Sequence, residues 1–392
     1  MPISRPGSRL AALFVAVPLS IFLGASSALL GACGPFTDFT DAGFCPFVLE
    51  IFYLGITTGT TPTTYDPASF VSRLQMATFL SRTVDGVLRR GSRRAALDRF
   101  WRPQNSGALG LTTIGALPFL CSSDGADVWT ANQVANSVSR VRGSDGKLLE
   151  TWTGANFAYG VMVAMGRVLV TGAVGVGGPF AVYSIDPSQP AGAVTVAANA
   201  VGTGPQGITF DGGRVWTANS ANSNGSVSII TPGPIPWTVT TVGTGTQLIG
   251  AVFDGTNVWV TANAAGKLFK LDPAGGILQT VTVGSNPYHP TFDGTNIWVP
   301  NAFSDSVSVV RASTGVILQT LTGNGIAGPT AAAFDGERIL IAGSGGSISF
   351  WKAADLTPLG SVATGPVGPL GACSDGLQFW VTYNTSNQLA RF

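Results

Sequence analysis

The residues that could do chemistry in this chain are few and scattered. One histidine occurs, His289, within Asn286-Pro287-Tyr288-His289-Pro290, and a lone histidine is more often structural than a general base. No G-x-S-x-G nucleophile elbow, H-E-x-x-H zinc motif, P-loop or EF-hand loop is present. No pair of cysteines has the CxxC spacing of a zinc or redox site. The sequence therefore predicts no catalytic residue, no metal site and no cofactor.

Composition limits the function classes further. Lys and Arg number 21 against 20 Asp and Glu, so the net charge of +1 argues against a polyanionic partner, nucleic acid included. Charged residues make up only 10% of the chain, while Gly numbers 52 and Pro 24. A hydrophobic content of 45% excludes general disorder. This composition favours short strands joined by tight turns.

An internal repeat organises the chain from about residue 108 onward. Its anchor is an Asp-Gly turn followed, three residues after the glycine, by an apolar residue and Trp. Two copies are weaker and lack the Trp. The anchor glycines recur every 39 to 46 residues, at positions 125, 166, 212, 255, 294, 336 and 376.

Each repeat contains four strand-like pieces. In the fourth copy they are 249–253, 257–261, 267–271 and 278–283. Four short strands in about 40 residues form one propeller blade. The predicted fold class is therefore mainly β, a seven-bladed β-propeller of four-stranded blades over 108–392, preceded by a small α-helical module.

The ends of the repeat region predict how the ring closes. After Trp380 only two strand-like pieces follow, so the seventh blade lacks its outer strand. A spare piece, 111–115, precedes the first Asp-Gly turn and matches the fourth-strand pattern. We expect it to complete the seventh blade, and we expect deletion of 110–115 to unfold the ring.

The repeat also assigns structural roles to its recurring side chains. Trp at one repeat position would pack between neighbouring blades. The asparagines after them are expected to bond backbone at the next turn. These residues are Trp129, Trp216, Trp259, Trp298 and Trp380, with Asn132, Asn219, Asn263, Asn301 and Asn384.

Two cysteines fall in the first strands of the first and seventh blades. Cys121 lies three residues before its Asp-Gly turn and Cys373 lies two residues before its own. Strand alternation points two such residues to opposite faces. Only a bulge within 121–123 is then expected to join them, and their pairing stays open.

The N-terminus reads as an export signal over 1–32. Arg5 and Arg9 precede an apolar run that ends in small residues. Leu30-Gly31-Ala32-Cys33 resembles a bacterial lipobox, which would place a lipid on Cys33. A disulfide between Cys33 and Cys45 would compete with that lipid. We expect an exported protein, at the cell surface, in the periplasm or outside the cell.

The next segment, 36–104, is predicted as a small helical module that ends in a basic helix. Its F-x-D start, the Gly55-Ile56-Thr57-Thr58-Gly59 stretch and the V-x-R-x-Q-M-A-x-F-L pattern over 71–80 resemble an S-layer homology (SLH) module. The resemblance implies binding of cell-wall polysaccharide through Asp38 and Arg73. Ser72 and Gln75 depart from the Thr and Glu of the family's motif.

The blades, with V-W-V-x-N strand ends and S-V-x-V third strands, resemble the YVTN and virginiamycin B lyase-like propellers. That lyase branch uses histidine chemistry with a bound metal, which one histidine cannot supply. Tyr288 stands where the lyase histidine is expected. The resemblance therefore implies the fold, while the activity is not carried over.

Two functional hypotheses follow. The first is an exported envelope or secreted binding and scaffold protein, whose monomeric propeller presents an interaction face. Its partner would be cell-wall polysaccharide or an envelope or secreted protein, and it would meet the membrane only through the signal or a lipid on Cys33. The alternative is an extracytoplasmic lyase or hydrolase that uses the central funnel. Tyr288, His289 and Gln206 are the funnel candidates.

Overall fold

The computed structural model describes two units, divided between Phe100 and Trp101. The predicted signal segment 1–32 and the basic segment 82–104 lie outside the described residues. The described residues are 33, 36–39, 41, 44–53, 57, 59–61, 63–73, 75–80, 110–175, 178–221, 224–365 and 367–392.

The N-terminal unit is built around one helix and a small aromatic core. Helix α2 (Cys45–Tyr53) is followed by a second helical stretch at 75–80. Phe36 is fully buried, and its ring centre lies 5.2 Å from that of Phe52 and 5.5 Å from that of Tyr65. Because so short a segment buries little apolar surface, it needs additional cross-links.

A disulfide between Cys33 and Cys45 supplies that cross-link. Both cysteines belong to the same core cluster as Phe36. The bond uses the sulfur atom that a lipid on Cys33 would need, so the two modifications of Cys33 exclude each other. The structure contains the disulfide.

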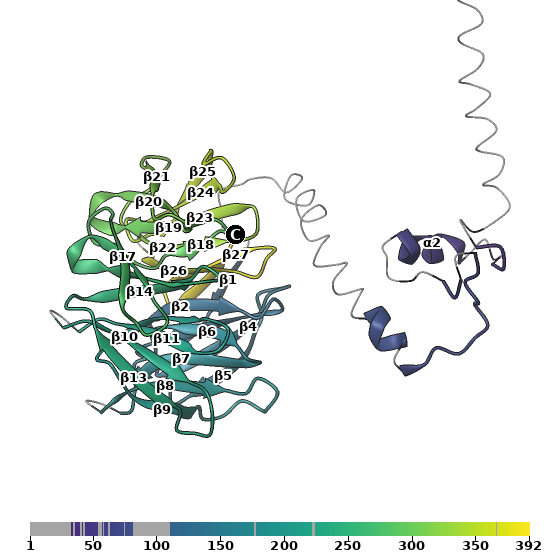
Figure 1. The fold of residues 1–392 in the computed structure, drawn as a ribbon, viewed down its shortest axis with the longest axis horizontal. Helices are drawn as coiled ribbons and strands as arrows, with labels where there is room; N and C mark the ends of the chain where they lie inside the picture. The colour runs from purple at the N-terminus through teal and green to yellow at the C-terminus, as the bar shows by residue number, and fades with distance from the viewer. Residues whose placement is uncertain are drawn as a thin grey trace, which may run out of the picture. The chain divides into compact units, whose positions relative to one another are not determined.

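The second unit is a seven-bladed β-propeller, as the repeat predicted (Figure 1). Each blade is a four-stranded antiparallel sheet in which consecutive strands pair. The first strands of adjacent blades contact one another around the ring, so they are the inner strands. Blades 1 to 4 are β2 (Pro118–Ser123), β3 (Asp127–Asn132), β4 (Ser137–Arg142), β5 (Leu148–Thr153); β6 (Val161–Ala164), β7 (Arg167–Ala173), β8 (Phe180–Ile185), β9 (Thr195–Val201); β10 (Pro205–Phe210), β11 (Val215–Asn219), β12 (Ser226–Thr231), β13 (Thr238–Gly243); and β14 (Leu248–Phe253), β15 (Val258–Ala262), β16 (Lys267–Leu271), β17 (Ile277–Thr282).

The remaining blades follow the same order. Short 3-10 turns, η1 (Asn263–Ala265) and η2 (Ala302–Ser304), follow the second strands of blades 4 and 5. Blades 5 to 7 are β18 (Thr291–Phe292), β19 (Asn296–Asn301), β20 (Ser306–Arg311), β21 (Ile317–Leu321); β22 (Pro329–Phe334), β23 (Arg338–Gly343), β24 (Ser347–Lys352), β25 (Pro358–Ala363); and β26 (Pro369–Ser374), β27 (Phe379–Tyr383), β28 (Gln388–Arg391), with β1 (Gly110–Thr113).

The ring closes through β1, as predicted. β1 pairs with β28, so the sheet order of blade 7 is β1-β28-β27-β26. The register runs from Gly110 opposite Arg391 to Thr113 opposite Gln388. The chain's first propeller strand is thus held by its last, which leaves no blade incomplete.

The Asp-Gly turn and the Trp form one structural motif. In blade 4 the Asp254 Oδ1 accepts backbone N–H groups of Thr256 and Asn257, and its Oδ2 accepts the indole N–H of Trp259 at 2.7 Å. The same indole bond occurs in blades 1, 3, 5 and 7. All five indoles are at most 1% exposed, which confirms their predicted core role. A buried indole needs such an acceptor.

The two weaker repeats show the motif's logic by substitution. In blade 2 Met165 replaces the Asp and Leu169 replaces the Trp, so donor and acceptor are lost together. In blade 6 Leu340 replaces the Trp while Asp335 remains. There the guanidinium Nε of Arg338 donates to the Asp335 Oδ2 at 2.9 Å.

The prediction for the repeated asparagines was wrong in most blades. Asn219 donates to the hydroxyls of Ser226 and Ser228, both at 3.0 Å. Asn132 and Asn301 bond the equivalent serines of their own blades. The two serines of the S-V-S pattern lie on one face of the sheet, because they alternate along the third strand, and the first of them pairs directly with the Asn. The Asn side chain therefore bonds serine hydroxyls rather than the backbone of the turn. Only Asn263 donates to backbone, at Pro287.

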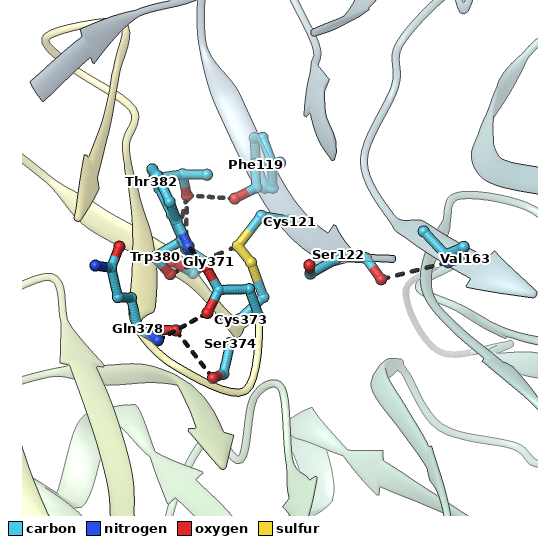
Figure 2. The surroundings of a disulfide bond; sticks show 12 residues. Phe119, Cys121, Ser122, Val163, Gly371, Cys373, Ser374, Gln378, Trp380 and Thr382 are labelled. Atoms are coloured by element: carbon cyan, nitrogen blue, oxygen red, sulfur yellow. Dashed lines mark hydrogen bonds between the residues drawn. A yellow bond between two sulfur atoms is a disulfide. The ribbon is translucent and has the colours of Figure 1, made fainter. Parts of the chain in front are cut away.

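The bulge requirement for the second disulfide was also wrong. Cys121 pairs with Thr130, whereas Cys373 pairs with Trp380, so they differ by one register step, and the pairing of 121–123 is regular. The two cysteines nevertheless form a disulfide between blades 1 and 7 (Figure 2). Adjacent blades turn opposite faces toward each other. A one-residue offset is therefore what brings both sulfurs into the junction.

Candidate functional site

The two ends of the propeller are made of different connections. The asparagine face, as we name it, consists of the hairpins between second and third strands and the connections between blades. The aspartate face consists of the Asp-Gly turns and the turns between third and fourth strands. Among the described residues, the asparagine face comprises 114–117, 133–136, 154–160, 174–175, 178–179, 202–204, 220–221, 224–225, 244–247, 263–266, 283–290, 302–305, 322–328, 344–346, 364–365, 367–368 and 384–387.

Charge is segregated between these two faces. In sequence, the connections of the asparagine face contain a single Asp or Glu, Asp305, and no Lys or Arg. The Asp305 carboxylate accepts the backbone N–H of Gly328 at 2.7 Å. The turns of the aspartate face carry most of the propeller's acids: Asp124, Asp145, Asp186, Asp211, Asp254, Asp272, Asp293, Asp335, Glu337, Asp355 and Asp375.

The ion pairs described in the propeller follow the same division. Arg140 binds Asp127 at 2.7 Å, and Arg338 binds Asp335 at 2.9 Å, both toward the aspartate face. One basic residue, Lys267, lies directly after a hairpin of the asparagine face, at the start of β16. The asparagine face therefore offers amides, hydroxyls and rings, with almost no charge.

Two of the predicted funnel residues occupy equivalent places. Pro205 pairs with Asn219, and Pro287 pairs with Asn301, so Gln206 and Tyr288 each follow the first paired residue of their blade. Both are half-buried. Gln206 belongs to blade 3 and Tyr288 to blade 5, so blade 4 separates the two residues. The full inner ring is Phe119, Tyr159, Gln206, Ile249, Tyr288, Thr330 and Leu370.

The third funnel candidate, His289, is a buried residue of a blade junction. It is 8% exposed, and burial lowers its pKa to about 4, so its imidazole is neutral at pH 7. Its backbone N–H donates to Thr330 and its carbonyl accepts from Ala332, which ties blade 5 to blade 6. Its ring lies 5.8 Å from that of Tyr288.

Two other blades show why a large side chain at the position of His289 is unusual. Blades 4 and 7 have Gly250 and Gly371 at the corresponding place. A Cβ at Gly250 would lie 2.6 Å from the Tyr288 carbonyl oxygen, and one at Gly371 would lie 2.2 Å from the Phe119 oxygen. Inner strands thus approach closely at this level.

An aromatic cluster at the junction of blades 1 and 2 was missed by the sequence analysis. The rings of Phe119 and Tyr159 meet edge to face, with centres 4.8 Å apart. Burial raises the pKa of the Tyr159 phenol, which also hydrogen-bonds the side chain of Gln133. Phe157 is 38% exposed and Val134 is 64% exposed on the adjoining loops. The signal was the aromatic pair Phe157 and Tyr159 in a connection between blades.

The N-terminal candidates are placed differently. The two Asp38 oxygens each accept a backbone N–H, from Tyr65 and Asp66, at 2.8 Å. The bond from Tyr65 is the largest cause of a lowered pKa of Asp38. Arg73 is exposed at the start of the second helical stretch. The structure therefore shows that Asp38 fastens a loop, and the binding of wall polysaccharide by Asp38 and Arg73 stays a prediction.

The described residues contain neither a grouped set of metal ligands nor a membrane-spanning helix. Among them, no three His, Cys, Asp or Glu side chains are grouped as a metal site. Within the same residues, no helix has the length and apolarity needed to cross a bilayer.

Comparison with known proteins defines the class by its fold. Hydrazine synthase from Kuenenia stuttgartiensis is 17% identical, with a TM-score of 0.60 over 74% of this chain and 98% of that one. A catalytically inactive virginiamycin B lyase from Staphylococcus aureus, with quinupristin, is 15% identical, with a TM-score of 0.53 over 72% and 98%. The WD40 propeller domain of Doa1 is 12% identical, with a TM-score of 0.56 over 73% and 96%.

These similarities establish a seven-bladed propeller that resembles the virginiamycin B lyase-like propellers. At such identities they concern the fold alone, and the matched proteins differ in function. No family model and no curated protein matches the chain.

Proposed function

We propose that the protein is an exported binding or scaffold protein, of the cell envelope or secreted, whose propeller presents its asparagine face to a ligand or protein partner. The observation that carries this proposal is the segregation of charge. An end of the ring that lacks charge but exposes Val134 and Phe157 has the composition of a contact surface. The ion pairs of the other face stabilise the fold and need no partner.

The predicted helical module, 36–104, is proposed to attach the propeller to the cell surface. Asp38 and Arg73 remain the candidate residues for wall polysaccharide. Ser72 and Gln75, which depart from the SLH motif, bond each other's backbone N–H groups at 2.8 and 3.2 Å and so form a capping box. The two disulfides support an oxidising compartment, and hence export.

The alternative, a lyase or hydrolase in the funnel, has less support. It would depend on Tyr288 and His289, and the imidazole of His289 is buried, with a pKa lowered to about 4 that makes it a weak base. A general base needs reach to a substrate proton. We therefore place function at the asparagine face.

The proposal is tested with two matched variants of the mature chain, residues 33–392. Val134→Asp adds a charge to the asparagine face, and Val316→Asp adds one to the aspartate face, where Val316 is 57% exposed. Binding to envelope preparations and to concentrated secreted protein is measured by cosedimentation and pull-down. We expect Val134→Asp to weaken binding at least tenfold and Val316→Asp to leave it unchanged. Equal binding by both variants, or no binding by the parent chain, contradicts the proposal.

A further inference from the structure

Two apolar residues of the asparagine face, Leu117 and Phe157, are held in an unfavourable backbone conformation. Phe157 has a φ of +52°, a left-handed value that side chains other than Gly, Asn and Asp rarely adopt. Its backbone N–H donates to the Asn136 Oδ1 at 3.0 Å, and Asn136 itself has a φ of +48°. The ring of Phe157 is nevertheless 38% exposed, so it does not gain full burial in return. Strain of this kind often marks a binding site.

Phe157 stands beside the Phe119 and Tyr159 pair. Tyr159 lies two positions after Phe157 on the same connection and hydrogen-bonds Gln133. Val134, the next residue, is exposed. The connections at this junction therefore carry the exposed Phe157 and Val134 together with the Phe119 and Tyr159 ring pair and the Gln133 amide, and we name these five residues the aromatic junction.

The chemistry of the aromatic junction selects a class of ligand. An anionic or cationic ligand would lose hydration without gaining an opposite charge, because the surrounding connections carry only Asp305. Amides both donate and accept hydrogen bonds, as do the hydroxyls of a sugar. The negative face of an aromatic ring suits the C–H groups of a sugar ring. Resting on the proposed function, we infer that the aromatic junction binds an uncharged, hydroxyl-rich glycan, with Phe157 as a stacking platform.

A glycan fits the residues better than a protein partner does. Energetic centres of protein interfaces are enriched in Trp, Tyr and Arg. The connections of the asparagine face contain no Trp and no Arg, and their abundant side chains are Asn, Ser and Thr. Their chemistry matches hydroxyl groups more closely than it matches a charged protein rim.

The experiment separates binding from folding by using a residue that relieves strain. Phe157→Gly removes the ring, and glycine adopts a positive φ freely. Phe303→Ala removes another exposed Phe of the same face, 81% exposed in η2 of blade 5, and is the control. The mature chain and both variants are titrated by calorimetry with maltoheptaose, cellohexaose and soluble mannan, and with hyaluronate and chitosan as anionic and cationic probes.

We expect binding of at least one neutral glycan, weakened at least tenfold by Phe157→Gly with an unchanged or higher melting temperature, and unaffected by Phe303→Ala. Exclusive binding of hyaluronate or chitosan overturns the inference, as does equal neutral-glycan binding by Phe157→Gly. A protein partner would be assigned by three results together. Val134→Asp abolishes envelope binding, neutral glycans do not compete with it, and protease treatment of the envelope removes it. That result would overturn the glycan and retain the proposed function.

Discussion

At the scale of single residues, the most informative contact is the bond, present in five blades, between the Asp of the Asp-Gly turn and the indole of the following strand. Asp254 joins a turn to the core because one oxygen fastens the turn and the other accepts from Trp259. Blade 2 lacks both partners, whereas blade 6 keeps Asp335 without the Trp and pairs it with Arg338 instead. The repeat's sequence pattern is thus a hydrogen-bonding requirement.

We predict a measurable coupling between Asp254 and Trp259. Asp254→Ala leaves a buried indole N–H without its acceptor, which should lower the free energy of unfolding by about 1–3 kcal/mol. Once Trp259→Phe has removed the donor, the same Asp substitution should cost less. Urea unfolding of the two single variants and the double variant gives the coupling energy. Strict additivity of the single effects would contradict the motif.

A second residue-scale prediction concerns pH. His289 has an ordinary pKa of 6.5 and a folded pKa of about 4, so the unfolded chain binds its proton more readily. Its contribution is constant above about pH 6.5 and is lost as the pH falls toward 4, by about 3 kcal/mol. His289→Ala should remove this part of the acid destabilisation. Unfolding free energies of both chains at pH 7.5, 5.5 and 4 provide the measurement, and parallel pH curves would rule the effect out.

The role of a residue could be predicted where the same residue type recurs at one position of the repeat. Five Trp at one repeat position could only be packed away, and the structure buries them. Partners were harder to predict. The Asn219 bonds depend on Ser226 and Ser228, which reach it only through strand pairing. Phe157 could have been noticed as an aromatic residue near Tyr159 in a connection between blades, but its positive φ has no sequence signature.

At the scale of elements, the ring is closed by hydrogen bonds and by a disulfide at the same junction. β1 completes blade 7 by hydrogen bonds, and Cys121 is bonded to Cys373 across the same junction of blades 7 and 1. The strand was predictable because the repeat left one piece spare and one blade short. The disulfide was misjudged because alternation was applied to one sheet, whereas the cysteines belong to two sheets that face each other.

We predict that this disulfide is a large contributor to stability. It links positions separated by 252 residues, and in the chain-entropy model such a loop is worth about 5 kcal/mol. The double substitution Cys121→Ser with Cys373→Ser should lower the propeller's melting temperature while the Trp near-UV signal stays native at 20 °C. Cys33→Ser with Cys45→Ser is the control and should leave the propeller transition in place. Identical transitions in both double variants would argue against a stabilising role of the Cys121–Cys373 disulfide.

At the scale of the whole molecule, the propeller has two chemically different ends. The Asp-Gly turns that predicted the fold also collect the acids at one end, so fold and charge distribution come from the same repeat. The sequence predicted a ring with a funnel, but it did not show which face lacks charge. That distinction requires the strand order, because it depends on which connections share an end.

The nearly uncharged asparagine face leads to a prediction about ionic strength. Binding that releases no counterions and uses no ion pairs should be nearly independent of salt. The dissociation constant for envelope material should change less than twofold between 50 and 500 mM NaCl. A steep decline in affinity with salt would instead locate the contact at the charged face.

The closure of the ring has a mechanical consequence. If the N-terminal unit is fixed to a surface and the propeller is pulled by its ligand, tension enters the ring at Gly110, the first residue of β1. That load first separates β1 from β28, which pair over four residues, and then meets Ile114, which is buried in the core of the same junction. Peeling then meets Cys121, whose covalent bond to Cys373 passes the load directly into blade 7. The protein can therefore give way by a few residues under force while its ring stays closed.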